Sequence, residues 1–153
     1  MPIDAFVTPL AEQQIDALRA RDRRAYDEWL AMLRAHGCQA LHYRLTGEDL
    51  VERLCVVHLV GPLRVVVAFQ SPEIAVVVLV GPHKDDDPGI DVYTQLYGLA
   101  DLDKPPTGKR TKPPCCGGQD GSPPLVDADA VDDLFRRARR LSGSDRRRAQ
   151  RKR

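Results

Sequence analysis

Four side chains suited to binding an anion or moving a proton occupy neighbouring stretches in the middle of this 153-residue chain. Arg64 lies inside an apolar run, where a guanidinium stays charged and needs an anion or several hydrogen-bond acceptors. The following apolar run ends in His83 and Lys84, and Tyr93 comes after a short acidic loop. We expect this Arg, His, Lys and Tyr to converge at one end of a small sheet.

The two apolar runs, residues 63–69 and 74–80, predict a β-hairpin. Both are rich in β-branched residues, have the length of a strand and are bracketed by turn residues. Runs this apolar are typical of central strands that are covered on both faces. Elements on both sides of the sheet are therefore expected.

The turn at Gly61 and Pro62 decides where His58 points. A strand is predicted over residues 53–60, directly before this turn. A two-residue turn places His58 on the face opposite Arg64, because side chains alternate along a strand, whereas a longer loop reverses this arrangement. Both possibilities remain open from the sequence.

The rest of the chain predicts the elements that surround these strands. Thr8 and Pro9 are typical of a helix N-cap and a first helical residue, and Asp22 is suited to cap a second helix that ends at Gly37. The remaining predicted elements are an edge strand over 3–7, a half-buried strand over 39–45, a short helix over 91–102 and an amphipathic helix over 126–141.

The predicted fold class is α+β. We expect a small, mostly antiparallel sheet with two N-terminal helices packed on it, a short helix after the sheet, and a C-terminal helix with a basic tail. The chain divides into a domain over 1–102, a Pro/Gly-rich linker or ordered loop over 103–125, the C-terminal amphipathic helix over 126–141, and a basic tail over 142–153 whose composition predicts disorder.

The net charge of +1 conceals an uneven distribution of charge. Residues 134–153 carry ten Lys and Arg and one Asp, whereas residues 1–133 carry 13 basic and 21 acidic residues. A basic tail on an acidic body steers a protein toward nucleic acid or an acidic partner. No stretch approaches the 18 apolar residues of a membrane span, and the N-terminus lacks the features of a signal peptide, so a cytoplasmic location is expected.

The four cysteines give no clear metal-binding pattern. Cys38 and Cys55 lie in apolar surroundings and are expected to be buried thiols. Cys115 and Cys116 are adjacent, which leaves open a vicinal disulfide between them. No Cys-x-x-Cys spacing occurs, so neither a metal nor another cofactor is expected.

An ordered set of short motifs resembles the RelE/ParE superfamily of toxins from type II toxin–antitoxin systems, the RelE/HigB-like members in particular. The resemblance covers residues 3–102 and rests on the order of the motifs. They are Val7-Thr8-Pro9-Leu10-Ala11-Glu12, Leu45-Thr46-Gly47, Leu63-Arg64-Val65-Val66, Val80-Gly81-Pro82-His83-Lys84 and Asp91-Val92-Tyr93.

The resemblance implies a ribosome-associated mRNA endoribonuclease, an mRNA interferase that inhibits translation and is neutralised by a cognate antitoxin. It implies that the substrate's own 2′-OH attacks the adjacent phosphate without a metal, while the protein supplies proton transfer and positive charge. Arg64 would hold the scissile phosphate, His83 or Lys84 would act as the basic residue after the last strand, and Tyr93 would stack on the nucleotide. Further contacts to RNA are expected from His58, Lys109, Arg110, Lys112, Arg146, Arg147 and Arg148.

The alternative function is a non-nucleolytic toxin or binding module on the same fold, such as a ParE-like inhibitor of DNA gyrase. The expected partners are the antitoxin, mRNA and the ribosome, with DNA reached only through the antitoxin complex and no membrane. A structural interpretation also exists for each candidate: an ion pair for Arg64, a solvated loop for His83 and core packing for Tyr93.

Overall fold

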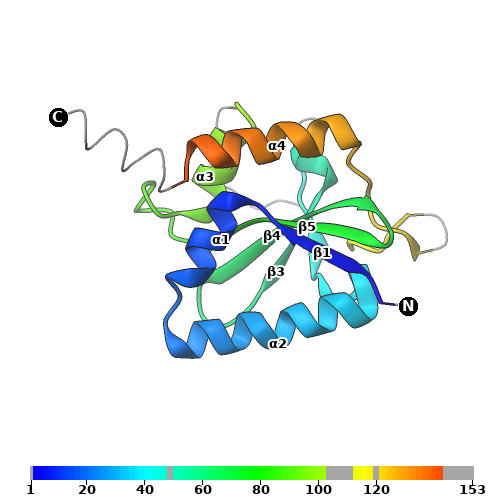
Figure 1. The fold of residues 1–153 in the computed structure, drawn as a ribbon, viewed down its shortest axis with the longest axis horizontal. Coiled ribbons are helices and arrows are strands. Elements are labelled where there is room, and N and C mark those ends of the chain that lie inside the picture. The colour runs from blue at the N-terminus through cyan, green and yellow to red at the C-terminus, as the bar shows by residue number, and fades with distance from the viewer. Residues whose placement is uncertain (1, 48–49, 103–111, 119–120, 143–153) are drawn as a thin grey trace.

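A five-stranded sheet between two layers of helices forms the framework of the protein (Figure 1). The computed structural model describes residues 2–47, 50–102, 112–118 and 121–142. Its elements are β1 (Asp4–Val7), α1 (Pro9–Asp16), α2 (Ala20–His36), the 3₁₀ turn η1 (Gly37–Ala40), β2 (Tyr43–Arg44), the 3₁₀ turn η2 (Val51–Arg53), β3 (Leu54–His58), β4 (Leu63–Ser71), β5 (Ile74–Pro82), α3 (Val92–Leu99) and α4 (Ala128–Arg140).

The strand order is β1-β5-β4-β3-β2, and only the β1–β5 pair is parallel. The prediction of a mostly antiparallel sheet in an α+β fold is therefore confirmed. The predicted hairpin is also confirmed, since β4 and β5 pair from end to end. Two irregularities interrupt the register: one after Val66 leaves Val78 unpaired, and one after Phe69 leaves Gln70 unpaired. β1 is an edge strand of the sheet, as predicted from its short, partly apolar sequence.

Both faces of the central strands are covered, as their unbroken apolar sequences predict. On one face α2 packs Tyr26, Trp29 and Leu33 against the odd-numbered residues of β4. On the other face α3 and α4 cover the even-numbered residues, Val66 and Ala68 among them. Burial of these side chains is the main force that holds the layers together, at about 25 cal/mol for each Å² of apolar surface removed from water.

Helix starts are predicted correctly at α1 but not at α2. The Thr8 hydroxyl accepts a hydrogen bond from the Ala11 backbone N–H at 3.1 Å and donates one to the Val78 carbonyl at 2.9 Å, so it ties α1 to β5. The prediction that Asp22 caps the second helix is wrong, because the helix begins earlier and Arg19 is its N-cap residue. Asp22 instead lies in the first turn, where its charge favours the helix dipole.

The strand predicted over 39–45 is mostly wrong. Residues Gly37–Ala40 form a 3₁₀ turn, and only Tyr43–Arg44 pair with β3. Ala40 and Leu41 are both buried, and the Ala40 carbonyl accepts a hydrogen bond from the Trp29 indole N–H at 2.9 Å. Two successive buried residues are incompatible with the alternation of a half-buried strand.

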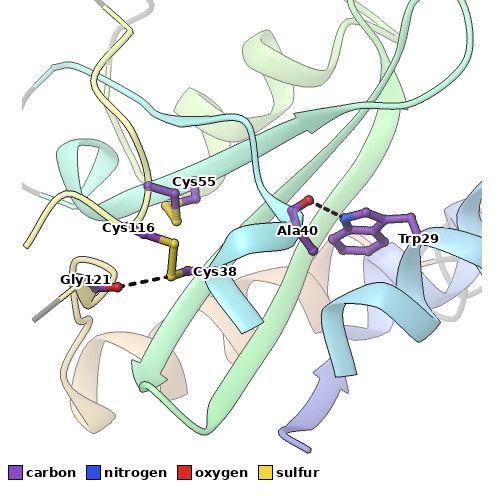
Figure 2. The surroundings of a disulfide bond; sticks show 7 residues. Trp29, Cys38, Ala40, Cys55, Cys116 and Gly121 are labelled. Carbon is purple, nitrogen blue, oxygen red and sulfur yellow. Dashed lines mark hydrogen bonds between the residues drawn. A yellow bond between two sulfur atoms is a disulfide. The ribbon is translucent and has the colours of Figure 1, made fainter. Parts of the chain in front are cut away.

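The cysteines form two disulfides, Cys38–Cys116 and Cys55–Cys115, so the prediction of free buried thiols is wrong (Figure 2). The adjacent Cys115 and Cys116 do not pair with each other but attach their segment to η1 and to β3. This pairing depends on the tertiary structure: the segment that carries Cys115 and Cys116 lies beside the edge strand β2, where the Arg44 N–H donates a hydrogen bond to the Pro113 carbonyl at 2.8 Å. The cysteines therefore give no support to the expected reducing compartment.

The C-terminal amphipathic helix is an integral layer of the fold. Its buried residues Val131, Leu134 and Ala138 pack on the sheet face, and the Val126 N–H donates a hydrogen bond to the Phe69 carbonyl at 2.7 Å. Its predicted extent, 126–141, exceeds the observed helix by three residues. None of the described helices combines the length and the apolar character needed to cross a membrane.

Candidate functional site: a cationic cluster at one end of the sheet

His58 and Arg64 lie side by side on the sheet face that α3 covers. They are directly paired residues of β3 and β4, and Arg64 is in turn paired with Gly81 of β5. The connection from β3 to β4 is longer than two residues, and Gly61 within it has φ of 55°, a left-handed conformation that glycine adopts without strain. Of the two arrangements that the sequence allows, the longer loop is therefore the one that forms.

The guanidinium of Arg64 is held by neutral partners, two backbone carbonyls and the Tyr93 hydroxyl. Its Nη1 donates hydrogen bonds to the carbonyls of Gly61 at 2.9 Å and Leu63 at 3.2 Å. Its Nε is buried and has no acceptor. No ion pair joins Arg64 to a carboxylate among residues 2–47, 50–102, 112–118 and 121–142. The structural alternative for Arg64, an ion pair, is thus not found in the described part of the chain.

His58 is held as a neutral imidazole beside this cation. The Tyr43 hydroxyl lies 2.8 Å from its Nε2, and its backbone N–H donates to His42 Nδ1 at 3.2 Å. Burial, followed by the positive charge of Arg64, lowers the pKa of His58 from 6.5 to about 4. At neutral pH His58 is therefore uncharged and shares a hydrogen bond with the Tyr43 hydroxyl.

Tyr93, at the start of α3, closes the cluster on the other side. Burial raises the pKa of its hydroxyl well above the ordinary value, the nearby Tyr43 hydroxyl raises it further, and the Arg64 charge lowers it. The His83 ring meets the Tyr93 ring edge-to-face, with centroids 4.8 Å apart. Of the four residues expected to converge, Arg64, His83 and Tyr93 come together, whereas Lys84 takes part only through its backbone N–H.

His83 is tied to the carboxylate of Asp91, a residue of the Asp91-Val92-Tyr93 motif to which the sequence assigned no role. His83 Nδ1 lies 3.2 Å from Asp91 Oδ1, and the side chain of Asp91 is fully buried. Burial alone would raise the pKa of Asp91, but hydrogen bonds from the N–H groups of Lys84 and Thr94, from the Thr94 hydroxyl and from His83 outweigh it and hold that pKa far below its usual range. The carboxylate is therefore charged under all ordinary conditions. Lys84 is exposed, and its part in the site is its backbone N–H.

Lys112 extends the cluster over β2. Its ammonium lies 5.2 Å from the centroid of the Tyr43 ring, a cation–π arrangement. The disulfides of Cys115 and Cys116 hold this segment in place. The other basic residues expected to contact RNA, Lys109, Arg110, Arg146, Arg147 and Arg148, lie outside the described residues.

One group in the described part of the chain has three potential metal ligands close together. The donor atoms of His83, Asp85 and Asp91 lie within 4.8 Å of one another. Both carboxylate oxygens of Asp91 already accept hydrogen bonds, from Lys84 N at 2.7 Å and from Thr94 N at 2.9 Å. We therefore interpret Asp91 as a hydrogen-bonded support for His83, and Asp85 as an exposed neighbour of that pair.

Two members of the site, Tyr43 and Asp91, were missed from the sequence. The alternating apolar pattern of its segment indicated that Tyr43 lies in a strand. Its contact with His58, however, depends on the register between β2 and β3, which the pattern does not specify. Asp91 had a local signal, because Asp three residues before Thr94 is an N-cap pattern, and its side chain does accept from the Thr94 N–H. The contact of Asp91 with His83 requires the turn between β5 and α3.

Comparison with protein-family models, with curated proteins and with solved structures produced no match.

Proposed function

We propose that the protein is a metal-independent endoribonuclease that cleaves mRNA at the ribosome, a toxin of the RelE/HigB type held inactive by a cognate antitoxin. The observation that supports this most directly is the cluster around Arg64. The Arg64 guanidinium has no carboxylate partner among the described residues. It lies beside His58, which is neutral, and near Tyr93, which is protonated. Phosphodiester chemistry needs a localised positive charge with proton-transfer groups beside it.

In the proposed reaction the 2′-OH of the substrate attacks the adjacent phosphorus. The O2′–P bond forms, the P–O5′ bond breaks, and the products are a 2′,3′-cyclic phosphate and a 5′-OH. Arg64 binds the phosphate and stabilises the charge of the pentavalent transition state. His83 takes the proton from the 2′-OH. Tyr93, which stays protonated because its pKa is raised, donates a hydrogen bond toward the leaving O5′, and O5′ takes up a proton from solvent to become the 5′-OH.

Tyr43 and Lys112 suit the binding of a nucleotide next to the scissile phosphate. An aromatic ring offers a stacking surface for a base, and an ammonium above it attracts the phosphate backbone. Binding of this kind is independent of sequence and weakens with salt. Recognition of a particular codon would need contacts from the ribosome or from other parts of the chain.

The test is controlled expression followed by mapping of RNA 5′ ends in cells that carry the wild type, Arg64→Ala, Arg64→Lys or Arg24→Ala. Arg24 is an exposed arginine on α2 and serves as the matched control. We expect growth arrest and new 5′-OH ends within translated messages for the wild type and Arg24→Ala. Loss of one such charge-stabilising donor slows cleavage by about 10²–10³-fold. Arg64→Lys keeps the charge but loses the planar fork, so its rate should fall as well.

Cleavage that persists in Arg64→Ala contradicts the proposed function. Arrest with intact RNA and damaged DNA would instead indicate the alternative, an inhibitor of DNA gyrase. The proposal requires the protein to reach ribosomes in the cytoplasm, where thiols are kept reduced. Activity in vitro should therefore be measured with the two disulfides intact and after their reduction.

A further inference from the structure

The Asp91 carboxylate binds two parts of the chain at once, the start of α3 and the segment that follows β5. Its Oδ2 accepts from the Thr94 N–H and hydroxyl, both at 2.9 Å, which is the capping role at α3. Its Oδ1 faces the other way and accepts from the Lys84 N–H at 2.7 Å, with His83 Nδ1 at 3.2 Å. Capping alone accounts for Oδ2 and leaves the contact with His83 unexplained.

The charge state of Asp91 determines which nitrogen of His83 carries the proton. The hydrogen bonds from Lys84 and Thr94 keep the carboxylate ionised, so that it accepts hydrogen bonds and donates none. A neutral imidazole beside it must therefore place its proton on Nδ1. The Nε2 atom of His83 then carries no proton and can accept one, and the His83 side chain is 38% exposed.

We infer that Asp91 is a positioning residue, whose buried carboxylate fixes His83 as the Nδ1–H tautomer and turns the basic Nε2 outward to take the proton of the RNA 2′-OH. The second half of this inference rests on the proposed function. The Tyr93 ring, edge-to-face with His83, restricts the imidazole from a second side. The arrangement follows the general rule that a catalytic histidine is oriented by the hydrogen bond at its other nitrogen.

Asp85 is the one competing carboxylate in the described part of the chain. Its Oδ1 lies 3.8 Å from His83 Nδ1, and its side chain is 55% exposed. A hydrogen bond to nitrogen is weak at that distance, whereas the 3.2 Å contact with Asp91 is within range. Asp85→Asn is therefore the matched control, since it removes a nearby acid without removing the acceptor of Nδ1.

The first measurement is the tautomer of His83, read from the ¹⁵N chemical shifts of its imidazole at a pH where the ring is neutral. Asp91→Asn and Asp91→Ser are the test variants, because Asn and Ser both remain good N-cap residues. We expect the Nδ1–H form in the wild type and in Asp85→Asn. In both Asp91 variants the proton should move to Nε2, because an amide N–H can donate to Nδ1 and a serine is too short to reach it.

The second measurement is the rate of RNA cleavage by the same four proteins. Proton transfer by a positioned side chain contributes about 10²–10⁴-fold, so we expect both Asp91 variants to lose at least about tenfold while Asp85→Asn stays near the wild-type rate. A purely structural cap would move neither the tautomer nor, in Asp91→Ser, the rate.

A wild type with its His83 proton on Nε2 would overturn the inference outright. The expected tautomers combined with undiminished cleavage in the Asp91 variants would overturn the catalytic half and leave only the orientation of the ring. If the wild type cleaves no RNA, the proposed function fails and the catalytic half fails with it. The tautomer measurement then still decides whether Asp91 fixes His83, so the two failures are distinguishable.

Discussion

Removal of the disulfide between Cys38 and Cys116 should lower the free energy of unfolding by about 3 kcal/mol, and removal of both disulfides by about 7 kcal/mol. The bridges join residues 78 and 60 positions apart in the sequence. A cross-link that closes a loop of this size in the unfolded chain stabilises the fold by about 4 kcal/mol in the loop-entropy treatment.

The adjacency of Cys115 and Cys116 makes the two bridges interdependent. Once Cys55 is joined to Cys115, the second bridge closes a loop of only roughly 18 residues. This loop consists of the segment from Cys38 to Cys55 together with the adjacent pair Cys115 and Cys116. A loop of this size contributes about 3 kcal/mol. Loss of either bridge alone therefore costs about 3 kcal/mol, and loss of both exceeds the sum of the single losses by about 1 kcal/mol.

The assay is urea unfolding without reductant, followed through the fluorescence of Trp29, the single tryptophan, which is 4% exposed. Cys38→Ser/Cys116→Ser suits the half-buried pair, and Cys55→Ala/Cys115→Ala suits the buried pair, since a buried hydroxyl would add its own cost. Four reactive thiols in unreduced, denatured wild type would refute the pairing itself. Strictly additive losses, with both bridges verified by mass spectrometry, would refute the argument from loop closure.

Three further predictions concern stability. The pKa of His58 is lower in the folded protein than in the unfolded chain, so the unfolded chain takes up a proton first as the pH falls. The free energy of unfolding should therefore decrease between about pH 6.5 and about pH 4, by at most about 3 kcal/mol and by less where solvent screens the ring. This loss should vanish in His58→Gln. Leu134→Ala should cost about 2–5 kcal/mol in chemical unfolding, and a loss below about 1 kcal/mol would contradict the packing of α4 on the sheet. Trp29→Phe should cost about 1–3 kcal/mol, because the Ala40 carbonyl loses its donor, and calorimetry at neutral pH would show this as a lower melting temperature.

Much of the framework is local in origin and was predictable. The β-branched runs of β4 and β5, with a short polar turn between them, have no better conformation than a buried hairpin. Thr8 before Pro9 specifies the start of α1, because a hydroxyl and a fixed φ meet the needs of a helix N-terminus wherever they occur. Alternation along β4 also fixed the face on which Arg64 lies. Each of these features depends on neighbours within a few residues.

Other features depend on chain segments that meet only in the folded protein. The pairing of Cys38 with Cys116 and of Cys55 with Cys115 follows from the return of the chain beside β2, which no cysteine spacing encodes. The same holds for Asp91, whose sequence context specifies an N-cap but not the imidazole beside it.

The sequence by itself determined that Arg64 lies within a buried strand, that both faces of that strand are covered, and that His83 and Tyr93 follow close behind. Only the tertiary structure decided that His58 shares the Arg64 face and that Tyr43 reaches His58, because both depend on the length of one loop and the register of one strand pair. Side-chain type and alternation are properties of a segment, whereas register and loop closure are properties of the whole chain, since a shift of one residue exchanges the two faces of a strand.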